Sequence, residues 1–210
     1  MRTHASAVAL TAAAVLALGP GAVPSAAATT GTWTVRPGGA VSAKAGKTVL
    51  TDTKSGNSLT CASSGMSGTL KAGSGLAGTG IGSFTTAVYR CPTPIFSYHL
   101  TPRGLPWHLN VISYDQQTGA ARGTISHLQL AFKIPETFCS AVIGGSGGAA
   151  SGGTVAVSYS GKTGQLKILT AGRTLHWYHV HNCGGLIADG DPATLSASYA
   201  ISPPQAITSP

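Results

Sequence analysis

Apolar and polar residues alternate with a period of two along much of the chain. In two segments the apolar side chains fall on one side of an extended backbone: Val155, Val157 and Tyr159 in the first, and Leu195, Ala197, Tyr199 and Ile201 in the second. Half-buried antiparallel strands have this period, whereas an amphipathic helix needs a period near 3.6. No segment shows a convincing helical pattern, so an all-β fold is predicted.

Three similar polar turns separate predicted strands. "ISYDQQTGAARGTI" from residue 112 and "VSYSGKTGQLKI" from residue 157 share Ser-Tyr, three residues and Thr-Gly. A fainter copy, "VLTDTKSGNSLTC" from residue 49, has Ser55-Gly56 in that place. Each glycine supplies the positive φ that a tight hairpin needs. The pattern predicts an antiparallel β-sandwich or flattened barrel built from hairpins, extending from about Trp33 to Ile207.

Two glycine-rich stretches, 65–83 and 144–153, are predicted to be surface loops. The segment 91–110, "CPTPIFSYHLTPRGLPWHLN", contains four prolines, which restrict it to irregular or edge structure. If the chain has a ligand-binding loop, we expect it in this segment. The candidate residues are Tyr98, His99, Arg103, Trp107 and His108.

The first 28 residues have the pattern of a signal peptide. Arg2 precedes an apolar stretch that ends in Ala26-Ala27-Ala28, a sequence that suits signal peptidase. Later segments lack the roughly 20 consecutive apolar residues of a membrane helix. We therefore expect residues 29–210 to form a single secreted, soluble, extracellular domain that is monomeric.

Four cysteines are present, and an exported chain with an even number is expected to form disulfides. Three pairings of Cys61, Cys91, Cys139 and Cys183 are possible. Cys139 and Cys183 follow the two clear repeat turns at nearly equal distances, which favours pairing them with each other. The predicted bridges are thus Cys61–Cys91 and Cys139–Cys183.

Charge is sparse and mainly positive. Without the signal peptide, 12 lysine and arginine residues oppose five acids, for a net charge of +7. Such a balance favours an acidic partner, although the basic residues are scattered and form no run typical of specific nucleic-acid binding. The expected partner is an anionic cell-envelope polymer, held weakly, released by salt, and held more tightly at pH 5 than at pH 8.

The segment 175–186, "LHWYHVHNCGGL", brings His176, His179, His181 and Cys183 close together in sequence. In an extended strand, Trp177, His179, His181 and Cys183 would share a face, so a zinc site is geometrically conceivable. A disulfide-bonded cysteine has no thiolate to offer, however, and no acid lies close to these histidines in sequence before Asp189. A histidine-bearing strand that ends in a disulfide is the preferred interpretation, with no metal or other cofactor.

Other motif matches lack their structural context. "GSGLAG" at 73–78 is followed by neither a predicted helix nor a suitable acid, as a dinucleotide site requires. "GGSGG" around Ser146 lacks the helix that follows a nucleophile elbow. The five acids lie in or beside predicted turns and connectors, so no catalytic residue is assigned.

The assembled features resemble a family of small secreted actinomycete proteins without an assigned activity. The resemblance rests on "WTVRPGGAVSAKAG", the Cys-Pro-x-Pro start, "WHLNVISYD" and "LIADGDPATLSASYAISPPQAI", and covers most of the mature chain. It implies secretion and a β-rich fold, but no catalytic motif.

We therefore expect a secreted, non-enzymatic protein of unknown ligand that binds or associates with the cell envelope. Two alternatives remain open. One is a hydrolase with a cryptic site among His99, His108, His179 and His181. The other is a protease inhibitor whose reactive segment is the proline-rich stretch 91–106.

Overall fold

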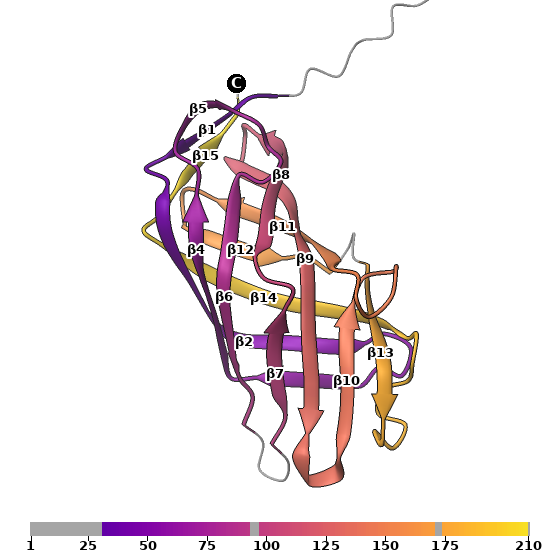
Figure 1. The fold of residues 1–210 in the computed structure, drawn as a ribbon. Coiled ribbons are helices and arrows are strands. Elements are labelled where there is room, and N and C mark those ends of the chain that lie inside the picture. Colours follow the sequence, from indigo (N-terminus) through magenta and orange to yellow (C-terminus); the bar gives the residue numbers. More distant parts are fainter. Residues whose placement is uncertain (1–30, 93–96, 171–173, 210) are drawn as a thin grey trace, which may run out of the picture.

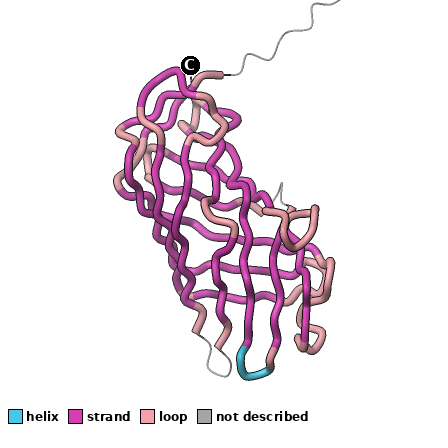
Figure 2. Tube along the Cα trace, in the orientation of Figure 1, coloured by secondary structure: helices cyan, strands magenta, loops and turns pink. Residues whose placement is uncertain are grey.

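The computed structural model describes residues 31–92, 97–170 and 174–209. The predicted signal peptide, 1–28, lies outside this range. The described residues form β-strands and one 3-10 turn, with no α-helix (Figures 1 and 2), so the prediction of an all-β, antiparallel fold is confirmed. The elements are β1 (Trp33–Arg36), β2 (Gly39–Asp52), β3 (Ser58–Cys61), β4 (Ser63–Leu70), β5 (Gly73–Leu76), β6 (Gly82–Arg90), β7 (His99–Arg103), β8 (Trp107–Asp115), β9 (Ala120–Ile134), η1 (Pro135–Thr137), β10 (Cys139–Gly144), β11 (Gly153–Ser160), β12 (Gln165–Ile168), β13 (Leu175–His181), β14 (Pro192–Ser202) and β15 (Ala206–Thr208).

The main sheet closes on itself. Its antiparallel neighbours run in the order β2, β4, β6, β8, β9, β11, β12 and β14, and β14 pairs back with β2. This closed ring is the flattened barrel that the hairpin pattern allowed. The small sheet β15–β1–β5 lies at one end of it, beside the C-terminus in Figure 1.

Long strands continue beyond the ring and form the other half of the molecule. The second half of β9 pairs with β7 and with β10, and β10 pairs with β13. The start of β14 pairs with the end of β2, whose outer neighbour there is β3. Figure 1 shows β2 and β14 crossing behind β7, β9 and β10. The same long strands therefore connect both halves.

Buried hydrophobic side chains form one continuous cluster through both halves. The largest fully buried ones include Trp107, Phe132, Trp177 and Tyr199, and the rings of Phe132 and Trp177 meet edge to face with centroids 5.6 Å apart. The alternating residues of β11 and β14 point into this core as predicted.

Bulges interrupt the alternation in the long strands. In β2, Ala45 and Thr48 are both buried, and the pairing with β14 shifts between them. In β9, Ile125 and Leu128 are both buried, and the pairing with β11 shifts at the same level. An extra residue bends a strand and reverses which side chains face inward. Each long strand can thereby line the ring and then the other half.

The three predicted turns are hairpin connections. Gly56 lies between β2 and β3, Gly119 between β8 and β9, and Gly164 between β11 and β12. Their φ angles are 79°, 69° and 65°, the left-handed region that glycine adopts without strain. The hairpin interpretation of the repeat is confirmed.

The prediction of a loop over 65–83 was wrong, because this stretch contains most of β4, all of β5 and the start of β6. Its glycines allow strands to approach closely: a Cβ on Gly68 would overlap the carbonyl oxygen of Ser83 on the neighbouring strand. The stretch 145–152 does connect β10 with β11 as a loop. The proline-bearing segment supplies β7, which pairs with β9 among the described strands.

Both predicted disulfides are formed. Cys61 pairs with Cys91, and Cys139 pairs with Cys183. The first joins the end of β3 to the residue after β6, and the second joins the start of β10 to the loop after β13. Among the described helical segments, none has the length and apolar character needed to cross a membrane.

Candidate functional site

An open groove of about 560 Å³ lies on the outer surface of β2, β12 and β14. Its polar lining comes from two lysines and three hydroxyl residues, with a short apolar floor between them. The lining residues are Lys47, Val49, Lys167, Ile168, Leu169, Thr170, Ser196, Ala197 and Ser198.

Strand pairing explains why the two lysines face this groove. Lys167 of β12 lies directly opposite Ser198 of β14, and both are exposed. Lys47 belongs to the bulge in β2, where Gly46 and Lys47 are successive exposed residues between buried Ala45 and Thr48. The bulge therefore adds a second cation to a surface whose strands otherwise present serine and threonine.

A second hollow of about 350 Å³ shares Lys167 with the groove. Its other lining residues are Ser158, Ser160, Thr163 and Gln165, from β11, β12 and the turn between them. The hydroxyl of Ser198 donates to Oε1 of Gln165 at 2.9 Å. The shared lysine makes the groove and the hollow one polar surface, which we call the lysine groove.

No acid lines the lysine groove. Two of the five acids, Asp52 and Asp191, are buried in the other half of the molecule. Nζ of Lys54 contacts Asp191 at 3.0 Å, and this hydrogen bond raises the pKa of Lys54. The positive charge of Lys47 and Lys167 thus has no partner within the groove, which favours an anionic ligand.

The remaining carboxylates also have structural contacts. Oδ1 of Asp115 accepts hydrogen bonds from the backbone N–H groups of the hairpin turn, and bonding with Thr118 lowers its pKa. Hydrogen bonds from its own N–H and from Ser97 lower the pKa of Glu136. Oδ1 of Asp189 accepts from the N–H of Val180 at 3.3 Å. These carboxylates hold turns and loops in place, as the sequence predicted.

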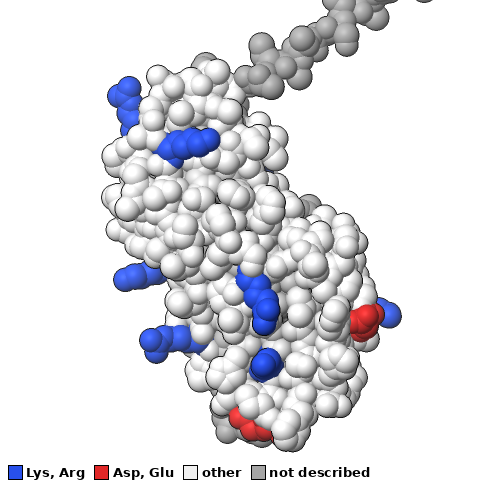
Figure 3. Space-filling model, viewed as in Figure 1, with Lys and Arg blue, Asp and Glu red and all other residues white. Residues whose placement is uncertain are grey.

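On the face shown in Figure 3, basic side chains are separated from one another and acidic ones occupy two places. This matches the scattered charge of the sequence. The lysine groove differs from this background because two cations border one hollow that also contains serine and threonine hydroxyls.

The five candidate residues of the predicted binding segment do not form one surface. Tyr98 is buried and its hydroxyl donates to the carbonyl oxygen of Thr60, while Trp107 is fully buried and its Nε1 donates to the carbonyl oxygen of Arg103 at 2.9 Å. His99 and Arg103 are exposed on β7, and His108 is half-buried on β8. Tyr98 and Trp107 are therefore core side chains that anchor this segment.

The four histidines of the hydrolase alternative lie apart in the strand order. His99 pairs with Lys133 of β9, whereas His108 pairs with Ser126, at another level of the same strand. His179 and His181 are on β13, which is separated from β9 by β10. Strand pairing therefore gives these side chains no common site.

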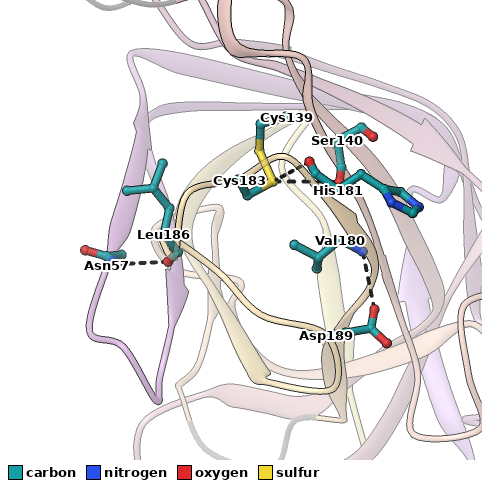
Figure 4. The surroundings of a disulfide bond; sticks show 8 residues. All are labelled: Asn57, Cys139, Ser140, Val180, His181, Cys183, Leu186 and Asp189. Atoms are coloured by element: carbon teal, nitrogen blue, oxygen red, sulfur yellow. Dashed lines mark hydrogen bonds between the residues drawn. A yellow bond between two sulfur atoms is a disulfide. The ribbon is translucent and has the colours of Figure 1, made fainter.

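The histidine-rich strand does not have the shared face that a metal site would need. A bulge at His179, whose φ is 53°, interrupts the pairing of β13 with β10. Trp177 and Cys183 are buried, but His179 and His181 are exposed. Figure 4 shows Cys183 bonded to Cys139 and the imidazole of His181 turned away from the sulfur atoms.

Within the described residues, no three histidine, cysteine, aspartate or glutamate side chains gather as metal ligands. Ser146 is exposed in the loop between β10 and β11, without the helix of a nucleophile elbow. The glycine-rich match at 73–78 contains β5 and is also not followed by a helix. These motifs lack the structures that their chemistry requires.

The chain matches no protein-family model, no curated protein and no solved structure. The lysine groove was not predicted from the sequence. Lys47, Lys167 and Ser198 are far apart along the chain, and only the closure of the sheet brings their strands together. Alternating Ser-x-Ser in β11 and β14 was the available signal, and it indicated only a polar outer face.

Proposed function

We propose that this is a secreted, non-enzymatic protein that binds an anionic polymer of the cell envelope in the lysine groove. The main observation behind this proposal is the groove, where Lys47 and Lys167 border an open surface that contains hydroxyl groups and no acid. A flexible polymer with regularly spaced phosphates fits this arrangement. The lysines attract successive charges, and the hydroxyl of Ser196 can donate to a phosphate oxygen, whereas that of Ser198 already donates to Gln165.

The open shape of the groove also suits a polymer. A volume of about 560 Å³ that is open to solvent can receive a short segment of a long chain without enclosing its ends. The positive charge of the whole chain, +8 before removal of the signal peptide, adds a weaker attraction that does not depend on position. Secretion, as predicted from residues 1–28, would place the groove where such polymers occur.

The test uses poly(glycerol phosphate) as the anionic probe and a neutral glucan of similar length as its control. Binding to the folded, disulfide-intact protein is measured by fluorescence anisotropy of labelled polymer across a range of salt concentrations. For a flexible polymer of phosphodiesters, each neutralised phosphate contributes about 0.7 to the magnitude of the slope of log K, the binding constant, against log salt concentration. Replacing both Lys47 and Lys167 with alanine should reduce the magnitude of that slope by about 1.4.

A matched control variant loses the same number of positive charges from outside the groove. Lys71 and Lys133 are exposed and lie outside the groove, so K71A/K133A removes two charges elsewhere. The proposal requires K47A/K167A to weaken binding substantially more than K71A/K133A. Equal losses would show that net charge alone attracts the polymer, and equal binding of the neutral glucan would exclude recognition of charge.

A further inference from the structure

His108 and His127 form a pair of imidazoles on the outer surface of β8 and β9. Their ring centroids lie 5.1 Å apart and their planes meet at 81°. His108 lies opposite Ser126, the residue before His127. His127 is exposed and His108 is half-buried. Residues 19 positions apart in sequence are thus brought into contact by one hairpin.

The bulge of β9 fixes the position of His127. Its φ of 64° is unusual for a residue other than glycine. Two glycines pack against this backbone: a Cβ on Gly152 would overlap the Cα of His127, and one on Gly104 would lie 3.2 Å from its carbonyl oxygen. Loops from both sides therefore hold the bulge in place. Such over-determined backbone conformations concentrate at functional sites.

The hydrogen-bonding pattern leaves a ligand atom free. Oγ of Ser126 lies 3.3 Å from Nδ1 of His127, and Nε2 has no such contact among the described hydrogen bonds. A hydrogen bond at one imidazole nitrogen sets the tautomer and orients the other nitrogen toward a metal. Ser126 thus has the place of an outer-shell partner.

The ring spacing fits a shared metal ion. An ion that binds two neighbouring imidazole nitrogens at about 2.0–2.1 Å holds the ring centres about 4.5 Å apart in the tetragonal geometry of Cu²⁺ and about 5.2 Å apart in the tetrahedral geometry of Zn²⁺. We propose that His108 and His127 form a two-imidazole binding site for a divalent transition-metal ion, with Cu²⁺ preferred over Zn²⁺. Imidazole suits both ions, and copper binds more tightly in the usual order of affinities.

Water completes the coordination of this ion. The described residues contain no third histidine, cysteine or carboxylate close enough to form a three-ligand group with the pair. The site is therefore an open, exchangeable one. It involves neither Lys47 nor Lys167, so it is independent of the proposed polymer binding.

The test titrates the folded protein with Cu²⁺ in the presence of glycine as a weak competitor, using calorimetry and electron paramagnetic resonance. One equivalent should bind, with nitrogen hyperfine structure from two imidazoles. His127→Asn should weaken this binding at least tenfold, as should His108→Gln. Asparagine tolerates positive φ, so the first variant preserves the bulge.

His179→Asn is the matched control. His179 is also an exposed histidine at a positive-φ bulge, and it lies on β13, away from the pair. The control should retain the affinity and the spectrum of the unchanged protein. Unaltered copper binding in H127N, or an equal loss in H179N, would overturn the proposal. Circular dichroism and thermal unfolding of each variant establish that it is folded.

Discussion

Replacing Ser64 with alanine is predicted to destabilise the protein through a buried chain of hydroxyl groups. Oγ of Ser64 lies 2.7 Å from Oγ1 of Thr48 and donates to the hydroxyl of Tyr199 at 3.0 Å. All three side chains are buried, with exposed fractions of 1% for Thr48, 6% for Ser64 and 0% for Tyr199. They come from β2, β4 and β14, and the serine occupies the middle.

The central position of Ser64 in this chain sets the size of the expected loss in the free energy of unfolding. Ser64→Ala removes a partner from two buried hydroxyl groups at once, and each buried group left unsatisfied costs about 1–3 kcal/mol. We expect a loss of about 3 kcal/mol in the free energy of unfolding. Tyr199→Phe leaves Ser64 bonded to Thr48, so it should cost only about 1 kcal/mol.

A triple variant separates this explanation from simple loss of packing. Combining Thr48→Val, Ser64→Ala and Tyr199→Phe replaces every member with an apolar group of similar shape, which removes the unsatisfied groups. The triple variant should therefore be more stable than Ser64→Ala alone. Urea unfolding of the disulfide-intact protein, followed by tryptophan fluorescence, measures all three. A loss in Ser64→Ala no larger than in Tyr199→Phe, or a triple variant no more stable than Ser64→Ala, would refute the reasoning.

Two further predictions concern stability. Burial raises the pKa of four tyrosines above the ordinary value of 10.0: Tyr89, Tyr98, Tyr159 and Tyr199. Above about pH 10 the unfolded chain therefore binds fewer protons than the native chain, so the free energy of unfolding should decline as pH rises. Urea titrations from pH 9 to 12 measure this decline, and a constant free energy of unfolding over that range would contradict the prediction. Replacing both Cys139 and Cys183 with serine opens a loop with a sequence separation of 44. The free energy of unfolding, measured in the same assay, should fall by about 4 kcal/mol. A fall of less than about 1 kcal/mol would show that the bridge hardly restricts the unfolded chain.

Local sequence signals were sufficient to predict the all-β fold class, the hairpin turns and the disulfide pairing. Gly119 and Gly164 have the positive φ that their place in the repeat predicted. The pairing of Cys139 with Cys183 followed from their equivalent places after two hairpins. These features depend on short-range chemistry, namely a glycine at a tight turn and strands joined by their own hairpins, so a single sequence contains them.

Glycine composition was misleading where a glycine packs against a neighbouring strand. Gly68 and Gly82 look like loop residues, but each lies in a strand where a side chain would collide with its neighbour: with Ser83 for Gly68, and with Leu70 for Gly82. Only the paired strand shows that the missing side chain is a packing requirement. The candidate residues Tyr98 and Trp107 show the converse, because large aromatic side chains in a proline-rich segment suggested a ligand loop and instead fill the core.

Both candidate sites depend on bulges, which period-two alternation does not reveal. At Gly46–Lys47 the bulge of β2 exposes two successive residues, and one of them is the lysine that borders the groove. At His127 the bulge of β9 turns an imidazole outward beside His108. A regular strand would bury every second residue at these points. An inserted residue instead adds an outward side chain without removing an inward one, so the core stays filled while polar chemistry accumulates on the surface. The long strands that cross from one half of the molecule to the other need such bends, and each of the two candidate sites includes a residue that such a bend turns outward.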